Sequence, residues 1–583
     1  MPPPTVTAHS WLAGSVGYEI YVRSFADSDG DGLGDLAGVR SRLPYLADLG
    51  VEVIWLTPFY PSPQRDHGYD IADHLDVDPR FGDLAELGRL LSDAHELGLR
   101  VLIDLVPNHT SDQHPWFVDA RSSRDAEHRS FYVWLPPGPD GGPPNNWVSH
   151  FGGPAWSYDE ASGEYYLHLF LPEQPDLNWA EPRVWDAFDR IVTTWLDRGI
   201  DGVRIDVAHA LVKDAELRDN PPRSQVADDA TVGPTPQFDR FHHAYDLDQD
   251  GVIEVYRHWR PLADAHDAVL LGEVFLLDAD RVDRYVADDA LHAAFCFAAL
   301  KVGWDADAIR RRLRPFVDAS GDALAWPLSS HDDPRAATRF GGGELGARRA
   351  HAYLTLLCGL PGTVFLFQGD ELGLDDGVLD EVPPQDPIAR RNPGETGRDP
   401  QRTPMPWEPG EHLGFTSGEP WLPLGANRTE ADTVAAQLGD PTSWLERTRR
   451  LLATRRSLTT LTDGSTTDWV IDDGPVIVIE RGGEVLVCLH VGDGGGAAIL
   501  ELPSDCRLAY ASADDVVLVE DHLTLPEDAA AIIELEPPEE QASISGMDEE
   551  ERALIDAARQ AADDLDDVAA HTAEPMTAEE VAR

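Results

Sequence analysis

Short runs of apolar residues alternate with amphipathic stretches from residue 16 to residue 373. The apolar runs are rich in β-branched and aromatic residues, as buried strands are. They lie at 16–25, 51–58, 100–109, 201–209, 268–275, 293–300, 324–333 and 363–373, and the run at 293–300 is the weakest. The stretches between them, such as 82–98, carry apolar residues at helical spacing. Strand–helix alternation predicts a parallel sheet, and eight such units predict a (β/α)₈ barrel.

Two regions break this alternation. Residues 107–180, rich in Trp, Tyr, Pro and Gly, are far longer than an ordinary connection, which predicts a small inserted domain after the third strand. From residue 456 short strands alternate with Gly/Asp turns, which predicts a C-terminal antiparallel β-sandwich domain over 456–537. The predicted fold is therefore α/β: residues 1–106 and 181–455 form the (β/α)₈ TIM barrel, with the inserted domain over its mouth. The acidic tail, 538–583, is expected to be partly helical or disordered.

An Asp-rich stretch, DSDGDGLGD at residues 27–35, has the alternating oxygen ligands and the turn-forming Gly with which a calcium loop begins. It departs from an EF-hand because position twelve is Gly38 instead of a bidentate Glu, and because the segment before it has the composition of a strand. The alternative is an Asp/Gly-rich turn without metal. We expect a bound ion with a structural role, since four carboxylates packed so closely repel one another unless a cation is present.

The composition limits the classes of partner that the protein is expected to bind. The 583 residues carry 105 acidic and 46 basic side chains, a formal net charge of −59, which argues against nucleic-acid and anionic-membrane partners. No apolar run is long enough to span a membrane, and the N-terminus lacks the basic region and apolar core of a signal peptide. The four cysteines lie far apart and are expected to be buried thiols, so we predict a cytoplasmic location. Lys213 and Lys301 are the only lysines. An acidic surface that is poor in lysine suits a protein adapted to high salt. A GC-rich coding sequence would also favour Arg over Lys.

Polar residues gather where the predicted strands end. They are Asp104, Asn108 and His109 after one strand, Arg204 and Asp206 after another, Glu273 after a third, and His331, Asp332 and Asp333 after a fourth. In a (β/α)₈ barrel these ends meet at the face that carries the chemistry. A helix cap or an ion pair would explain each residue alone, but their joint placement on separate strands indicates a site. Paired carboxylates on such a barrel are typical of enzymes that cleave glycosidic bonds.

The motifs that carry these residues resemble a known family. DLVPNH, GVRIDVAH, GEVF and SSHDDPR, in this order, resemble the strand-end motifs of the α-amylase family of glycoside hydrolases, family 13. QPDLNW, DHGYD, RTPMPW and the Asp-rich loop are most similar to the α-glucosidase and oligo-1,6-glucosidase branch. The stretch RIDVAHALVKD resembles bacterial, actinobacterial-type α-glucosidases. The resemblance covers residues 11–537 and leaves out the tail.

The resemblance implies a role for each matched residue. Asp206 would be the nucleophile, Glu273 the general acid/base with a raised pKa, and Asp332 the carboxylate that clamps sugar hydroxyls and stabilises the transition state. Arg204, on the same strand face as Asp206, would hold the nucleophile ionised. The residues implied for substrate binding are Asp66, Tyr69, His109, Arg204, His331 and Arg402, with Arg398 as a rival to Arg402. The implied metal ligands are Asp27, Asp29, Asp31, the Leu33 carbonyl and Asp35; the ion would be Ca²⁺, with Mg²⁺ as the alternative, and no organic cofactor is expected.

The leading hypothesis is an exo-acting, retaining α-glucosidase that releases α-D-glucose from the non-reducing end of short, maltose-type α-glucosides by double displacement, with transglucosylation as a side reaction. The alternatives are an oligo-1,6-glucosidase or a glucosyl-transferring or isomerising enzyme of the same family. A catalytically dead carbohydrate-binding protein is a remote alternative, because all three carboxylates are present. Val207, next to the nucleophile, accompanies α-1,6 activity in such relatives, whereas the longer stretch DVAHALVKD resembles maltose-type enzymes. We give the longer match more weight.

Two further features stand apart from these motifs. His67 occupies a place where relatives often carry Asn or another small residue. A second Asp-rich run, DLDQDG at 246–251, has Arg257 at position twelve and no strand closely before it. We expect this run to be a polar lead-in to the helix that follows it.

Overall fold

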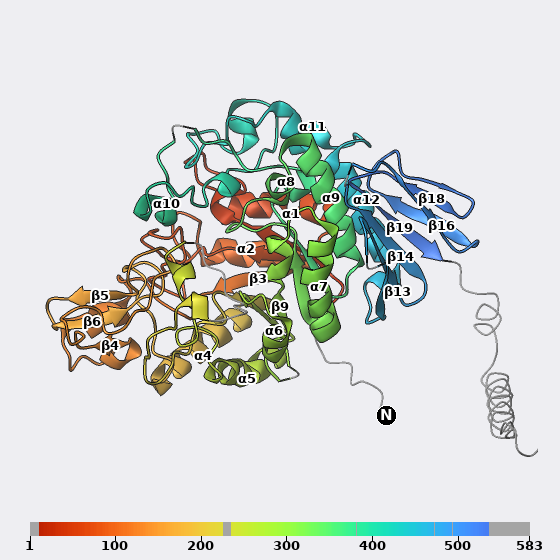
Figure 1. Cartoon of the computed structure of the whole chain (residues 1–583). Coiled ribbons are helices and arrows are strands. Elements are labelled where there is room, and N and C mark those ends of the chain that lie inside the picture. The colour runs from red at the N-terminus through yellow and green to blue at the C-terminus, as the bar shows by residue number, and fades with distance from the viewer. Residues whose placement is uncertain are drawn as a thin grey trace, which may run out of the picture.

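Eight parallel strands close into a barrel at the centre of the computed structural model (Figure 1). The structure describes residues 11–225, 235–287, 289–380, 382–471, 473–492 and 494–535. The strands follow one another around the barrel in the order β1-β11-β10-β9-β8-β7-β3-β2, which confirms the predicted (β/α)₈ fold. Their bounds are β1 Val16–Ile20, β2 Val53–Leu56, β3 Arg100–Leu105, β7 Gly202–Ile205, β8 Val269–Gly272, β9 Ala293–Phe295, β10 Leu324–Pro327 and β11 Thr363–Phe367.

The barrel strands are apolar because both of their faces are covered. Every residue of the eight strands except Arg100 is buried. Trp55, Phe295 and Phe365 belong to one apolar cluster inside the barrel, with ring centroids 5.0 Å apart for the two phenylalanines. The expected strand at 293–300 was only half right, since residues 297–301 form a 3₁₀ helix. Phe297, the first residue of this 3₁₀ helix, lines the cavity at the strand ends.

Helices follow each barrel strand and cover the outside of the barrel (Figure 1). Their bounds are α1 Leu36–Leu49, α2 Leu84–Glu96, α4 Pro182–Asp197, α5 Gly251–Asp264, α6 Ala279–Tyr285, α7 Ala306–Ser320, α9 Gly343–Gly359 and α12 Trp444–Ser457. The helix predicted at 82–98 is α2. It begins after Asp83, and the Asp83 side chain caps it by accepting a hydrogen bond from the Glu86 N–H. Helix α1 is followed by Gly50, whose φ of 103° is the left-handed conformation that favours glycine.

The region predicted as an insertion lies between β3 and α4, at the lower left of Figure 1. It contains a three-stranded antiparallel sheet in the order β4-β6-β5. Its two ends pair with each other, since the Leu177 N–H donates to the Asn108 carbonyl at 2.8 Å. This pairing anchors the region at the strand ends of the barrel. The bounds are α3 Pro115–Ser122, β4 Trp134–Leu135, β5 Trp156–Asp159 and β6 Glu164–Leu167.

Two antiparallel sheets follow α12 at the right of Figure 1. One has the order β12-β13-β14-β19-β16 and the other β15-β18-β17. Cys488 and Ile533 from the first sheet share an apolar core with Leu523 and Leu525 from the second, which confirms the predicted C-terminal β-sandwich. The bounds are β12 Thr467–Ile471, β13 Val476–Arg481, β14 Val485–His490, β15 Ala498–Glu501, β16 Cys506–Ala511, β17 Val517–Val519, β18 His522–Leu525 and β19 Ala529–Leu535.

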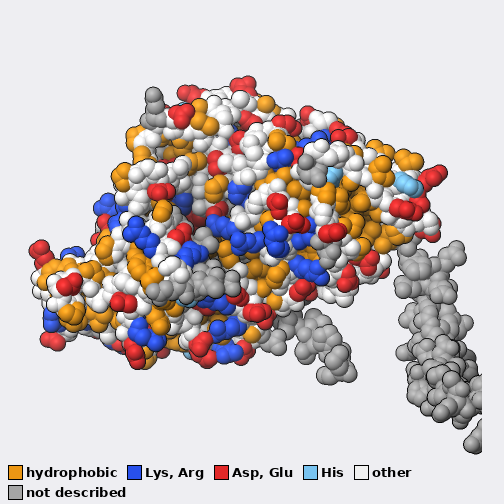
Figure 2. Space-filling view, viewed as in Figure 1, with side chains coloured by type: hydrophobic (Ala, Val, Ile, Leu, Met, Phe, Trp, Pro, Cys, Tyr) orange, Lys and Arg blue, Asp and Glu red, His pale blue; other side chains and the backbone are white. Residues whose placement is uncertain are grey.

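The long connections after β10 and β11 contain three short helices, α8 Ala336–Arg339, α10 Pro387–Arg391 and α11 Val434–Gln437. The acidic tail predicted at 538–583 lies outside the described residues. Within the described ranges, no helix combines the length and the apolar character that crossing a membrane requires. Figure 2 shows basic side chains gathered near the middle of one face, while acidic side chains are scattered over the whole face. The excess negative charge is therefore uneven on this face.

Candidate active site

A cavity of about 340 Å³ opens at the ends of the barrel strands. Six of the residues predicted for catalysis or substrate binding line it, namely Asp66, Tyr69, His109, Asp206, Glu273 and Asp332. The other three, Arg204, His331 and Arg402, are at most 2% exposed and lie beneath this lining. The structure therefore brings the whole predicted set together. The lining also includes aromatic and apolar residues that the sequence motifs did not single out, among them His150, Phe151, Phe170, Phe238, Phe275 and Ile388.

Arg204 on β7 lies at the centre of a cluster of carboxylates. Its Nη1 donates to Asp104 Oδ1 at 2.6 Å and to Asp206 Oδ1 at 2.8 Å. Its Nη2 lies 2.8 Å from Glu273 Oε2. Strand β7 pairs with β3 and β8, so the barrel register places these side chains around the guanidinium. The Trp55 ring, 4.7 Å from the guanidinium carbon, supports the planar group from one side.

Three carboxyl groups share this single guanidinium, and this sharing governs their titration. Burial and the facing charge of Glu273 raise the pKa of Asp206 well above its ordinary value, although Arg204 opposes the shift. Burial also raises the pKa of Glu273, again against Arg204. The raised pKa expected for Glu273 is therefore present. Arg204 does lower the pKa of Asp206, as expected, but burial and the charge of Glu273 outweigh its effect in the free site.

Asp332 lies in the loop after β10 and contacts other cations. Its Oδ1 accepts hydrogen bonds from Arg402 Nη2 at 2.6 Å and from Arg398 Nη1 at 2.9 Å. Burial acts against ionisation, but the guanidinium groups of Arg398 and Arg402 hold the pKa of Asp332 below its ordinary value, and His331 Nε2 lies 3.4 Å from the same carboxylate oxygen. Arg398 lines the cavity and also donates to Asp66 Oδ1 at 2.8 Å. Both rival arginines therefore hold Asp332, and Arg398 is the one that faces a ligand.

A second hydrogen-bonded network borders the cavity at Asp66, Tyr69 and His109, which is called its inner end. The Gln174 amide nitrogen lies 3.1 Å from Asp66 Oδ2 and 3.1 Å from His109 Nε2. Tyr69 stacks against the ring of His331 with the centroids 5.5 Å apart, and its hydroxyl lies 3.0 Å from His331 Nε2. Gln174 belongs to the motif QPDLNW, yet its contact with the site could not be inferred from the sequence.

Another part of the cavity lining is apolar and is called the outer wall. Val207, Phe275 and Phe297 contribute to its wall. Val207 has a φ of 45°, which is rare for a β-branched residue, and its N–H donates to Glu273 Oε2 at 2.8 Å. Lys301 forms an ion pair with Asp333 at this wall. A leaving group would therefore meet apolar side chains and one ion pair.

Sequence reasoning missed two residues beneath the cavity, Glu19 on β1 and Trp55 on β2. Glu19 is 2% exposed, and its carboxyl group bonds to His331 Nδ1. Trp55 Nε1 donates to Asp104 Oδ2 at 3.0 Å. The sequence did contain an indication, since Glu19 is the one charged residue within the otherwise uncharged strand VGYEI. Asp104 was noted as a strand-end residue, but its contact with Arg204 was not foreseen.

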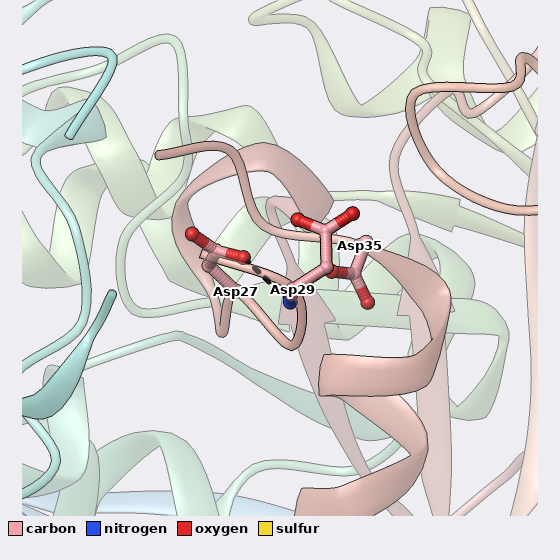
Figure 3. Close-up of side chains that lie close together, drawn as sticks. All are labelled: Asp27, Asp29 and Asp35. Atoms are coloured by element: carbon pink, nitrogen blue, oxygen red, sulfur yellow. Dashed lines mark hydrogen bonds between the residues drawn. The ribbon is translucent and has the colours of Figure 1, made fainter. Parts of the chain in front are cut away.

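The Asp-rich loop lies between β1 and α1, and Figure 3 shows its carboxylates. Asp27, Asp29 and Asp35 offer oxygens within 4.8 Å of one another, the only such group of His, Cys, Asp or Glu ligands found in the described part of the chain. Asp31 stands outside this group, and its carboxylate accepts a hydrogen bond from the Leu33 N–H at 2.8 Å. Carboxylate oxygens are the ligands that Ca²⁺ and Mg²⁺ prefer, so the chemistry of the donors fits the expected ion.

The loop also contacts a distant segment of the long connection after β11. The Asp27 N–H donates to the Phe415 carbonyl at 3.1 Å, and Thr416 Oγ1 donates to Asp27 Oδ2 at 2.5 Å. The Trp421 N–H donates to the Gly32 carbonyl at 2.9 Å. An ion held by Asp27 would therefore stabilise the contact between these two segments.

The second Asp-rich run takes part in ordinary hydrogen bonds. Asp248 accepts from Arg281 Nε at 2.6 Å and from the Tyr285 hydroxyl at 2.5 Å. Asp250 directly precedes helix α5. The run is thus a polar lead-in to α5, as expected.

Comparison with known proteins gives three kinds of match. Residues 19–464 match the family model described as "Alpha amylase, catalytic domain". The chain is 41% identical over 508 residues to a probable alpha-glucosidase of Rhizobium meliloti (strain 1021), covering 85% of this chain and 91% of that protein. It is 36% identical over 508 residues to an oligo-1,6-glucosidase of Halalkalibacterium halodurans, covering 80% of this chain and 87% of that protein. The solved structure of the alpha-glucosyl transfer enzyme XgtA superposes with a TM-score of 0.84 at 37% identity, covering 90% of this chain and 99% of that chain.

Proposed function

The chain belongs to the α-amylase family of glycoside hydrolases, and we propose that it is an exo-acting, retaining α-glucosidase that releases α-D-glucose from the non-reducing end of short α-glucosides. The observation that carries the proposal is the pair Asp206 and Glu273, at the ends of the neighbouring strands β7 and β8 and both bonded to Arg204. Two carboxyl groups held by one guanidinium lie close to each other, as a retaining mechanism requires.

The reaction takes two steps. In the first, a carboxylate oxygen of Asp206 bonds to the anomeric carbon while the bond to the leaving oxygen breaks, and Glu273 gives its proton to that oxygen. In the second, Glu273 takes a proton from water, whose oxygen attacks the same carbon and releases Asp206. Each step inverts the carbon, so the α-configuration is retained. Asp332, kept ionised by its arginine neighbours, faces the positive charge that develops on the sugar.

Hydrogen bonding supports these roles for the two carboxyl groups. Glu273 Oε2 accepts from the Val207 N–H and lies beside Arg204 Nη2, so Oε1 is the oxygen suited to carry the transferable proton. The pKa of Asp206 is raised by burial and by the negative charge of Glu273. The second of these causes disappears once Glu273 holds its proton, and Arg204 then favours an ionised nucleophile.

The closed inner end of the cavity supports exo action. Arg398 joins Asp66 to Asp332, and Gln174 joins Asp66 to His109. A ring of bonded side chains at this end accepts one terminal glucose and blocks the passage of a continuing sugar chain. Long starch should therefore be a poor substrate.

We propose maltose-type substrates, with α-1,6-linked glucosides as the alternative. Val207 lies in the outer wall, where the leaving sugar would sit, and a single methyl-for-hydroxyl difference there shifts discrimination by about 1–3 kcal/mol. The higher identity to a probable alpha-glucosidase than to an oligo-1,6-glucosidase supports maltose. The similarity to a glucosyl transfer enzyme and the apolar outer wall support transglucosylation as a side reaction, because such a wall binds an acceptor sugar ring better than water.

The test measures kcat/KM on maltose, isomaltose, sucrose and trehalose, with identification of the products. We expect turnover of maltose, with glucose as the product. An isomaltose value about a hundredfold or more above that of maltose, larger than one pocket contact explains, would favour an oligo-1,6-glucosidase. Asp206→Asn and Glu273→Gln should each nearly abolish turnover with unchanged melting temperatures, and a loss below about tenfold would contradict the assigned roles.

We further propose that the Asp-rich loop holds a structural Ca²⁺ ion, with Mg²⁺ as the alternative, and that the protein works in the cytoplasm of a salt-adapted source. The oxygen cluster of Asp27, Asp29 and Asp35 supports the ion. All four cysteines are free, which suits a reducing compartment. The net charge of −59 supports salt adaptation.

A further inference from the structure

His331 is enclosed by aromatic rings and hydrogen-bond partners. Tyr21 and Tyr69 both stack against its ring, with centroids 5.5 Å away and interplanar angles of 18° and 10°. Nδ1 bonds to the carboxyl group of Glu19, and Nε2 lies 3.0 Å from the Tyr69 hydroxyl. The side chain is 1% exposed. Its neighbours, and not solvent, therefore decide which nitrogen carries a proton.

The Tyr69 hydroxyl fixes the proton on Nε2. This hydroxyl donates its single proton to Asp104 Oδ2 at 3.1 Å. Asp104 is an acceptor on both oxygens, because Trp55 Nε1 donates to Oδ2 at 3.0 Å and Arg204 Nη1 donates to Oδ1 at 2.6 Å. The phenol oxygen is therefore the acceptor towards His331, and His331 Nε2 must carry a hydrogen.

A neutral imidazole with its hydrogen on Nε2 has a lone pair on Nδ1. We propose that Glu19 is a positioning residue that, as a neutral carboxylic acid, donates a hydrogen bond to His331 Nδ1 and so holds the His331 Nε2–H towards Tyr69 and Asp332. His331 Nε2 lies 3.4 Å from Asp332 Oδ1. The inference rests on the proposed function, since Tyr69 and Asp332 line the cavity in which the glucose would bind.

The competing arrangement is an ion pair between an ionised Glu19 and a doubly protonated His331. Burial opposes it at both ends, because burial raises the pKa of Glu19 well above its ordinary value and lowers the pKa of His331 well below its own. A neutral acid bonded to a neutral imidazole avoids two buried charges.

The charged groups around the pair come from several elements. Those that act on Glu19 or His331 are Asp104 on β3, Arg204 on β7, Asp332 after β10, and Arg398 and Arg402 after β11. These groups already pair with one another, through the bonds of Arg204 to Asp104 and of Arg398 and Arg402 to Asp332. Arg204 favours an ionised Glu19 and Asp332 favours a charged His331, but each of these charges already has a partner of opposite sign, and burial outweighs both effects.

Two variants separate the arrangements. Glu19→Gln keeps a neutral donor of the same shape, whereas Glu19→Met keeps the volume and removes the donor. We expect E19M to lose about a hundredfold in kcat on a short α-glucoside, as a misplaced group near the reaction does. E19Q should recover most of that loss and stay within about tenfold of the wild type, the most that one neutral hydrogen bond usually contributes. Its pH profile of kcat/KM should superpose on that of the wild type.

An infrared difference spectrum gives a readout that does not depend on activity. At neutral pH the wild type should show a carbonyl stretching band of a protonated carboxylic acid that E19Q lacks. Absence of that difference, or an E19Q variant as impaired as E19M and with a displaced pH profile, would overturn the inference in favour of the ion pair. Should E19M fail to fold, the E19Q kinetics and the infrared band still decide. A wild type inactive on every α-glucoside would defeat the proposed function, and the infrared result would remain a separate test of Glu19.

Discussion

Replacing Arg398 with Lys tests whether a forked cation closes the inner end of the cavity. Arg398 donates to three carboxylates, Asp332 at 2.9 Å, Asp66 at 2.8 Å and Asp386 at 2.9 Å. A lysine ammonium is a compact group on a flexible stem and cannot span these positions together. The variant therefore keeps the charge and loses two charge-assisted hydrogen bonds, each worth about 1.5–3 kcal/mol. The lower value, counted for both bonds, corresponds to about a hundredfold loss of kcat/KM.

The assay compares kcat/KM of R398K and the wild type on a short α-glucoside, with the melting temperature as a control for folding. Arg390→Lys is the matched control, since Arg390 is exposed on α10 and bonds only to Pro384 and Gln385 in the described structure. We expect this control to change kcat/KM by less than about twofold. A folded R398K whose kcat/KM stays within about threefold of the wild-type value would contradict this reasoning. Such a loss is smaller than the contribution of one charge-assisted hydrogen bond, so Asp66 and Asp332 would be held in place without the forked guanidinium.

Three further predictions concern the metal, the acid and the linkage. Removing the ion with a chelator should lower the melting temperature by mass action while leaving initial rates at low temperature unchanged; equal melting curves, in a preparation shown to be metal-free, would exclude the site. Because only protonated Glu273 can give a proton, kcat/KM should fall as the pH rises through the raised pKa of this residue, and a Glu273→Gln variant that keeps this limb would show that another group titrates. Val207→Thr should move the ratio of kcat/KM for maltose to that for isomaltose towards maltose by about tenfold or more, and an unchanged ratio would show that the long loops set the linkage.

The barrel could be predicted because strands covered on both faces are apolar along most of their length. The residues at which the strands end could not be predicted, because the apolar runs continue into the loops. The runs expected at 324–333 and 363–373 form strands only as far as Pro327 and Phe367. The three carboxylates proposed for catalysis were accessible from the sequence because each follows a strand directly or after a short loop, where a barrel gathers its side chains.

Other parts of the site depend on contacts between distant segments. Glu19 bonds to a histidine that lies 312 positions away, and Gln174 bonds to Asp66 from the inserted region. No local sequence pattern predicts contacts between residues that lie so far apart in the chain. The sequence also could not decide between Arg398 and Arg402, which lie in one long connection; only the structure shows that Arg398 lines the cavity while Arg402 lies behind Asp332. The Asp-rich loop was predicted as a metal site from its spacing, but Asp31 accepts from the Leu33 N–H and does not belong to the group of Asp27, Asp29 and Asp35.

Trapping the covalent intermediate tests the central claim most directly. A fluorinated α-glucosyl fluoride, which slows the second step more than the first, is incubated with the enzyme, and the quenched protein is digested and analysed by mass spectrometry. We expect one glucosyl adduct, carried by the peptide that contains Asp206 and absent from Asp206→Asn. An adduct on another residue, or no adduct together with β-glucose as the first product seen by NMR, would contradict double displacement through Asp206.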